Sequence, residues 1–132
     1  MANKVVGATI EIGYKYEIGV PTEGMNLPPG TFPAKEYIGV IRPVAPIHAR
    51  IEDDVYWTII NYTDKSPNVS VGNFDPADPI DFSAGNLAGM NAWGDSKQIK
   101  GKVKKDAKTR VYTYGIFIGK ELALDPELDI ES

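Results

Sequence analysis

The sequence contains no cysteine and a single histidine, His48. Without a thiolate, the chain cannot form a disulfide, a zinc–thiolate site, an iron–sulfur centre, a blue-copper site or a cysteine nucleophile. A Ser-His-Asp triad would have to use His48, yet no Gly-x-Ser-x-Gly motif occurs. The sequence therefore predicts no catalytic residue, and we expect His48 to be an ordinary strand residue.

Long hydrophobic runs are also missing. No stretch approaches the roughly 18 consecutive apolar residues that a membrane-spanning helix needs, and the first residues lack the apolar run of a signal peptide. We therefore expect no membrane partner and a cytoplasmic protein, although a secreted chain whose leader had been removed would show the same pattern. The net charge of −4 argues against nucleic acid as a partner.

The composition is that of one folded domain covering residues 1–132, with 42% hydrophobic and 24% charged residues. The 13 glycines and 10 prolines favour turns over helices. The glycine pair at 85 and 89 lacks the Lys-Ser/Thr tail of a phosphate-binding loop, and no other cofactor motif occurs. The sequence thus predicts a domain without a cofactor.

Alternation of apolar and polar residues is the strongest structural signal. Residues 10–20 place six apolar side chains at every second position, a period that only a strand converts into one apolar face. Residues 55–62 are the expected central strand, with Trp57 in the core, and residues 69–74 are expected to return from it as a hairpin. Further strands are expected at 37–41, 47–51, 98–104, 111–118 and 128–130.

The number and spacing of these segments predict the fold class. Seven to nine strands without helical periodicity indicate an all-β, antiparallel two-sheet sandwich, of the immunoglobulin-like or cupredoxin-like Greek-key type. A closed barrel is the alternative.

Residues 75–96 form the longest stretch expected to be irregular, and long loops often carry function. Within this stretch, Trp93 lies between Asn91 and Asp95, and a tryptophan beside polar groups is suited to stacking on a sugar ring. Asn91, Trp93 and Asp95 are therefore the predicted ligand-binding residues. The competing interpretation, which we favour on sequence alone, is that Trp93 folds back and plugs the end of the core.

The same stretch contains a weak calcium candidate. Asp75, Asp78 and Asp81 recur every three residues and could supply oxygen ligands, but the spacing is not that of an EF-hand. An Asp before a proline commonly starts a turn, so we favour a turn and expect no metal site here.

Basic residues are concentrated in one segment, because seven of the 14 lie between Lys97 and Arg110. Lys100, Lys102 and Lys104 would project from one strand face, next to tyrosines of the 111–118 strand if the two strands pair. Such a surface could bind oligonucleotides, but we favour an edge strand that lysines protect from aggregation. The acidic segment 121–131 could lie against it.

The second half of the chain resembles known proteins in four segments: 55–59, 69–74, 112–118 and the Asp-Pro-containing 124–130. The pattern is similar to small bacterial β-sandwich proteins without an assigned function, and its ending is similar to that of the bacterial inclusion-body protein family. The resemblance implies an immunoglobulin-like or cupredoxin-like fold and supplies no catalytic residues. The cupredoxin copper ligands are missing.

Together these observations predict a non-catalytic binding or self-associating module. Its expected partners are a carbohydrate bound through residues 75–96, a protein, or further copies of the chain. The alternative is a structural protein, such as an inclusion, tail or surface component. An enzyme that uses acidic residues is the least favoured interpretation.

Overall fold

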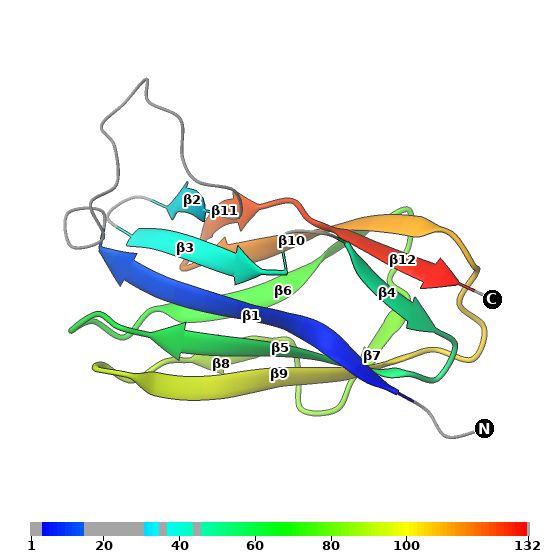
Figure 1. Cartoon of the computed structure of the whole chain (residues 1–132), viewed down its shortest axis with the longest axis horizontal. Helices are drawn as coiled ribbons and strands as arrows, with labels where there is room; N and C mark the ends of the chain where they lie inside the picture. The colour runs from blue at the N-terminus through cyan, green and yellow to red at the C-terminus, as the bar shows by residue number, and fades with distance from the viewer. Residues whose placement is uncertain (1–3, 15–30, 35–36, 44–45, 132) are drawn as a thin grey trace.

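The protein is a sandwich of two β-sheets packed face to face (Figure 1). The computed structural model describes residues 4–14, 31–34, 37–43 and 46–131, and within these ranges it contains twelve strands and no helix. Accordingly, nowhere in the described part of the chain does a helix of membrane-spanning length and hydrophobicity occur. The all-β sandwich expected from the alternating pattern is confirmed.

The strands divide equally between the two sheets. The first sheet has the order β2 (Thr31–Ala34), β3 (Tyr37–Arg42), β1 (Val5–Tyr14), β5 (Asp54–Asn61), β9 (Asp95–Val103) and β7 (Ile80–Phe82). The second has the order β4 (Ile47–Arg50), β12 (Glu127–Glu131), β10 (Val111–Ile118), β6 (Asn68–Asp75) and β8 (Leu87–Gly89), with β11 (Glu121–Leu124) also paired to β10. Most neighbours are antiparallel, but β1 and β5 are parallel, as are β4 and β12.

The expected strands are present, and short ones are added to them. The segments 37–41, 47–51, 55–62, 69–74, 98–104, 111–118 and 128–130 correspond to β3, β4, β5, β6, β9, β10 and β12. The first predicted strand is described as far as Tyr14, and its remainder, 15–20, lies outside the described residues. The count exceeds the expected seven to nine because β2, β7, β8 and β11, each of three or four residues, lie in segments where no strand was expected.

One predicted pairing is wrong: β5 and β6 do not form a hairpin. β5 belongs to the first sheet and β6 to the second, so the segment 62–67 crosses from one layer to the other. β5 pairs instead with β1 and β9, and β6 pairs with β10 and β8. The crossing places two apolar strand faces opposite each other, which buries both in the core.

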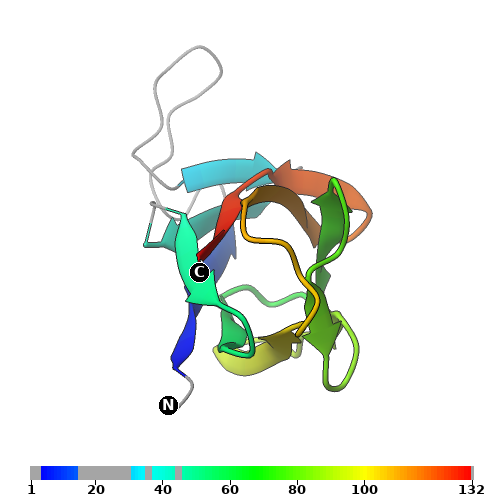
Figure 2. The same cartoon turned by 90° about the vertical axis from the view of Figure 1, so that its right-hand side faces the viewer.

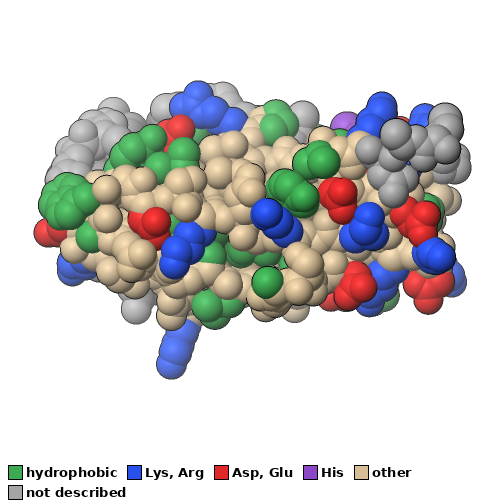
Figure 3. Space-filling view, turned by 90° about the horizontal axis from the view of Figure 1, so that it is seen from below, with side chains coloured by type: hydrophobic (Ala, Val, Ile, Leu, Met, Phe, Trp, Pro, Cys, Tyr) green, Lys and Arg blue, Asp and Glu red, His purple; other side chains and the backbone are tan. Residues whose placement is uncertain are grey.

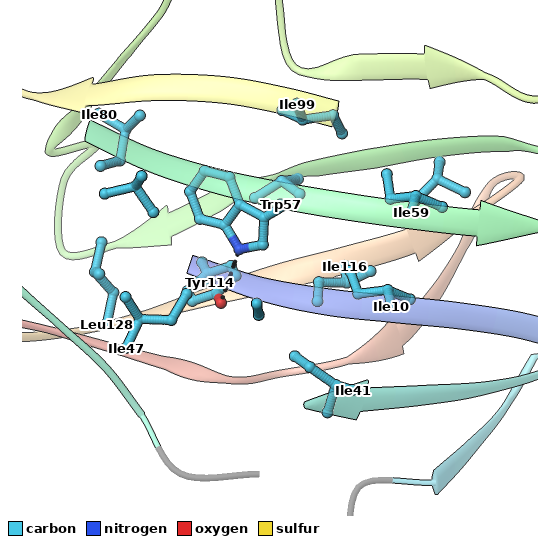
Figure 4. Packing of buried hydrophobic residues seen from close by; sticks show 14 of the residues in the cluster. Ile10, Ile41, Ile47, Trp57, Ile59, Ile80, Ile99, Tyr114, Ile116 and Leu128 are labelled. Carbon is cyan, nitrogen blue, oxygen red and sulfur yellow. Dashed lines mark hydrogen bonds between the residues drawn. The ribbon is translucent and has the colours of Figure 1, made fainter. Parts of the chain in front are cut away.

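The core lies between the sheets and is centred on Trp57, which is fully buried as predicted (Figure 4). The indole Nε1 of Trp57 donates a hydrogen bond to the hydroxyl of Tyr114 at 3.1 Å, so a polar contact joins the first sheet to the second. The two rings meet edge to face at 5.7 Å, and Phe74 stacks on Tyr114 at 5.2 Å. Burial raises the pKa of Tyr114 to about 12, with the hydrogen bond from Trp57 opposing the rise.

Two features hold β1 close to its parallel neighbour. Gly7 lies opposite Tyr56, and a Cβ atom at this position would overlap the carbonyl oxygen of Tyr56. The buried carboxylate of Asp53 accepts hydrogen bonds from the backbone N–H groups of Lys4 at 3.0 Å and Arg50 at 2.9 Å. Asp53 thereby ties the start of β1 to the end of β4.

Figure 2 shows the sandwich end-on, with the segment that joins β9 to β10 passing across this end. The hydroxyl of Tyr112 donates to the carbonyl oxygen of Lys108 at 2.8 Å and fixes this segment to β10. Residues 76–79 and 104–112 contribute to the lining of a groove of about 490 Å³ beside it.

Candidate functional site

The strongest candidate site is the turn that carries Trp93, where the end of β5 meets the start of β9. Asn61 is the last residue of β5, and it pairs in register with Asp95, the first residue of β9. The segments that extend from this pair, 61–65 and 91–95, hydrogen-bond to each other. We call these two segments the Trp93 corner.

A buried asparagine organises the Trp93 corner. The side-chain amide of Asn61 donates to the carbonyl oxygens of Lys65 at 2.7 Å and Asn91 at 2.8 Å. Its Oδ1 accepts from the backbone N–H of Thr63 at 3.1 Å and from the Thr63 hydroxyl at 2.7 Å. Asn61 and Thr63 are both fully buried, so each of these polar groups needs its partner and the corner is held in one arrangement.

The indole of Trp93 projects into solvent and is 71% exposed. Its backbone N–H donates to the Thr63 carbonyl at 2.8 Å, and the next residue, Gly94, donates to the Asn61 carbonyl at 2.6 Å. Both residues have positive φ angles, 59° at Trp93 and 83° at Gly94. The expectation that Trp93 plugs the core is wrong, because the backbone of the turn covers the corner and leaves the indole outside.

The other two predicted ligand residues lie in the same turn. The carboxylate of Asp95 accepts a hydrogen bond from the backbone N–H of Asn91 at 2.7 Å and lies 4.0 Å from the ammonium group of Lys97. Asn91 is exposed, and the side chain of Asp95 is 21% exposed. The structure therefore brings Asn91, Trp93 and Asp95 together, although part of the Asp95 carboxylate serves the turn itself.

Residues 75–96 are more ordered than the sequence suggested. β7 pairs with the end of β9, and β8 pairs with the start of β6, so this segment contributes a strand to each sheet. Only the turns between these strands are irregular, and the one that carries Trp93 is the last of them.

The three aspartates of the weak calcium candidate are all exposed and serve as turn or strand residues. Oδ1 of Asp78 accepts a hydrogen bond from the backbone N–H of Ile80 at 2.9 Å, which is the Asx turn expected of an Asp before a proline. Asp75 ends β6 and Asp81 lies in β7. In the described ranges, Asp75, Asp78 and Asp81 do not bring their carboxylate oxygens within 4.8 Å of one another.

The lysine strip on β9 is solvated, as predicted, but its surroundings differ from the prediction. β9 lies between β5 and β7 rather than at an edge, and it does not pair with the tyrosine-rich β10. Lys100 lies over the ring of Tyr56 at 5.3 Å, and Lys102 pairs with Asp54 at 3.3 Å. Figure 3 views the molecule from the β9 side and shows acidic and basic side chains interspersed there.

The acidic tail does not neutralise this strip, because its last strand, β12, belongs to the other sheet. Acidic residues just before and at the start of β5 supply the opposite charge instead. Asp54 pairs with Lys102, and Glu52 lies 3.6 Å from Lys105, which follows the strip. A surface of mixed charge offers no continuous positive path for a nucleic-acid backbone.

One cluster in the structure has no signal in the sequence pattern. His48 is a strand residue, as expected, but its Nδ1 lies 3.2 Å from carboxylate oxygens of both Asp129 and Glu131. Some eighty residues separate the two strands that carry these groups. The alternation that exposes positions 129 and 131 on one face was visible, whereas the parallel pairing of β4 with β12 was not.

Comparison with known proteins gives a likeness of fold only. No family model and no curated protein matches the chain. Among solved structures, one similar chain is described as "Crystal structure of multicopper oxidase", with a TM-score of 0.44 and 9% sequence identity. The match covers 99% of this chain and 45% of that one, so the chain spans less than half the length of that structure.

Proposed function

We propose that the protein is a non-catalytic binding module whose ligand surface is the Trp93 corner and whose ligand is a carbohydrate. One observation carries the proposal: an indole that is 71% exposed stands on a turn held by the buried Asn61 network. A large exposed aromatic on a rigid support gives contact area without the entropic cost of ordering a loop on binding.

The chemistry of the corner fits a sugar. The apolar face of an indole stacks on the C–H face of a pyranose ring, while nearby amide and carboxylate groups hydrogen-bond to hydroxyls. Asn91 and Asp95 provide such groups within two residues of Trp93. The openness of the corner supports binding over catalysis, because an open surface does not exclude water from a reacting group.

Tryptophan fluorescence tests the proposal, because the only other tryptophan, Trp57, is fully buried and serves as an internal reference. Titration with a panel of glycans should give a saturable change in the exposed component of the emission. Because Trp93→Ala removes the reporting indole itself, binding to this variant is measured by calorimetry, where it should be lost without a change in the unfolding transition. Leu122→Ala removes a side chain of similar exposure, 53%, from β11 in the other sheet and should leave the response intact. No saturable response across the panel would refute carbohydrate binding.

Assembly through strand edges receives less support from the geometry. Among the strands that the structure describes, the outermost ones are β2 and β7 in one sheet and β4 and β8 in the other, and each is three or four residues long. Short edges offer few free backbone groups for pairing with another chain. Self-association, a protein ligand and a structural role therefore remain predictions, and a molecular mass by light scattering that rises with concentration would favour them over a monomeric binding module.

A further inference from the structure

The exposed face of the β4–β12 pair carries one imidazole and two carboxylates that converge. The parallel register places His48 opposite Asp129 and Arg50 opposite Glu131. Oδ2 of Asp129 and Oε1 of Glu131 each lie 3.2 Å from Nδ1 of His48. The three atoms all lie within 4.8 Å of one another.

An ordinary ion pair does not account for this convergence. Nδ1 carries at most one hydrogen, so it can donate a well-directed hydrogen bond to only one of the two carboxylates. The carboxylates also repel each other, and nothing in a His–Asp pair requires Glu131 to approach the same nitrogen. A cation located between all three atoms would satisfy each of them.

The distances match the geometry of a small divalent ion. Nitrogen and oxygen ligands lie about 2.0–2.2 Å from zinc, which places the ligand atoms of a tetrahedral site about 3.3–3.6 Å apart. Both distances from Nδ1 are 3.2 Å, slightly shorter than this spacing, so the two carboxylates need to move outward only a little to admit an ion. Glu131 has the longest side chain of the three and its side chain is 52% exposed, so it can adjust.

We propose that His48, Asp129 and Glu131 bind a divalent transition-metal ion of the zinc type, with water completing the coordination. The imidazole nitrogen favours zinc, copper or nickel over magnesium and calcium, which prefer ligand sets made entirely of oxygen. The side chains are 29–56% exposed, so an ion can enter directly from solvent. The site is separate from the Trp93 corner and does not rest on the proposed function.

Charged neighbours on the same strands also act on this site. Arg50 lies opposite Glu131 and opposes cation binding, whereas Glu127, exposed two residues before Asp129 on β12, favours it. Val111 of β10, the other neighbour of Asp129, is uncharged.

The test uses protein that carries no histidine tag and has been treated with a chelator. Zinc ion is titrated into it, and binding is monitored by calorimetry and by NMR of the imidazole. With a single histidine in the chain, every imidazole signal reports His48. We expect saturable binding of one ion per chain and a shift of the His48 resonances. His48→Ala should weaken binding by more than about 100-fold, since loss of even an outer partner of a metal site costs about 10–100-fold.

Asp129→Asn removes a ligand and should weaken binding by a similar factor. Glu127→Gln makes the same change of charge on the same strand face but removes no ligand, so it should weaken binding only slightly. All three substituted residues are at least partly exposed, so each variant should fold, which the unfolding transition checks. Zinc binding that survives His48→Ala, calcium binding as tight as zinc binding, or no saturable zinc binding would each overturn the proposal.

Discussion

Replacing Tyr114 with phenylalanine is the sharpest test of how the two sheets are joined. Trp57 and Tyr114 are 0% and 1% exposed, and the Tyr114 hydroxyl accepts the indole N–H at 3.1 Å. Tyr114→Phe keeps the ring, so no cavity opens, but it leaves the indole N–H buried without this acceptor. An unsatisfied buried donor costs about 1–3 kcal/mol, and the free energy of unfolding at neutral pH should fall by that amount.

The same substitution should change how stability depends on alkaline pH. Burial raises the pKa of Tyr114 in the folded protein from 10.0 to about 12. Between these values the unfolded chain loses this proton while the folded protein keeps it, so rising pH favours unfolding. The contribution of the Tyr114 proton to the free energy of unfolding is therefore fully present below pH 10 and is lost as the pH rises towards 12. A pKa difference of about two corresponds to a loss of about 3 kcal/mol.

Urea unfolding of the wild type and of Tyr114→Phe, at neutral pH and at about pH 11, measures both effects. The variant should be less stable at neutral pH and should lose less stability on alkalinisation, so that the two curves converge. Tyr62→Phe is the control, because Tyr62 is 51% exposed and the change should leave stability nearly unaltered. A Tyr114→Phe protein as stable as the wild type at neutral pH, or with the same alkaline loss, would refute the reasoning.

Three further substitutions probe the scaffold. Gly7→Ala should lower the free energy of unfolding by about 1–3 kcal/mol, because the added methyl group would overlap the Tyr56 carbonyl. Gly89→Ala, on the short strand β8, is the control and should lower it less. Equal losses in thermal unfolding would contradict the close approach of Gly7 to Tyr56. Asn61→Ala should lower the free energy of unfolding by at least about 2 kcal/mol and also weaken ligand binding at the Trp93 corner. Urea unfolding that shows unchanged stability would contradict the role given to the Asn61 hydrogen bonds. Asp53→Ala should cost about 1–2 kcal/mol and speed hydrogen exchange at the start of β1, and unchanged exchange would show that this carboxylate does not anchor the strand.

The alternating pattern predicted the strands well and their partners poorly. β5 and β10 were recognisable because every second side chain enters the core, a constraint that acts within one strand. Whether β6 returns beside β5 or crosses to the other sheet depends on the turn between them, and the turn residues at 63–68 suit both paths. β7 and β8, with three residues each, are too short to show a period and are defined only by their partners.

The candidate sites show the same contrast between what nearby residues predict and what depends on contacts between distant segments. Asn91, Trp93 and Asp95 could be grouped from the sequence because they lie within five residues of one another. The exposure of Trp93 could not be predicted, since it depends on hydrogen bonds from its turn to Asn61 and Thr63. The metal-site residues on β4 and β12 meet only through a pairing between strands distant in sequence, which no local pattern encodes.

The architecture makes the two proposals independent of each other. The core uses the inward residues of each strand, whereas Trp93 and His48 both project outward, so removal of either side chain opens no cavity in the core. The Trp93 corner follows the end of β5, and the metal site lies on β4 and β12, at the opposite end of the long axis (Figure 1). Changes at distant sites without shared partners are additive. A loss of sugar binding by calorimetry in Trp93→Ala, or of zinc binding in His48→Ala, with unfolding unchanged, can therefore be attributed to the ligand contact itself.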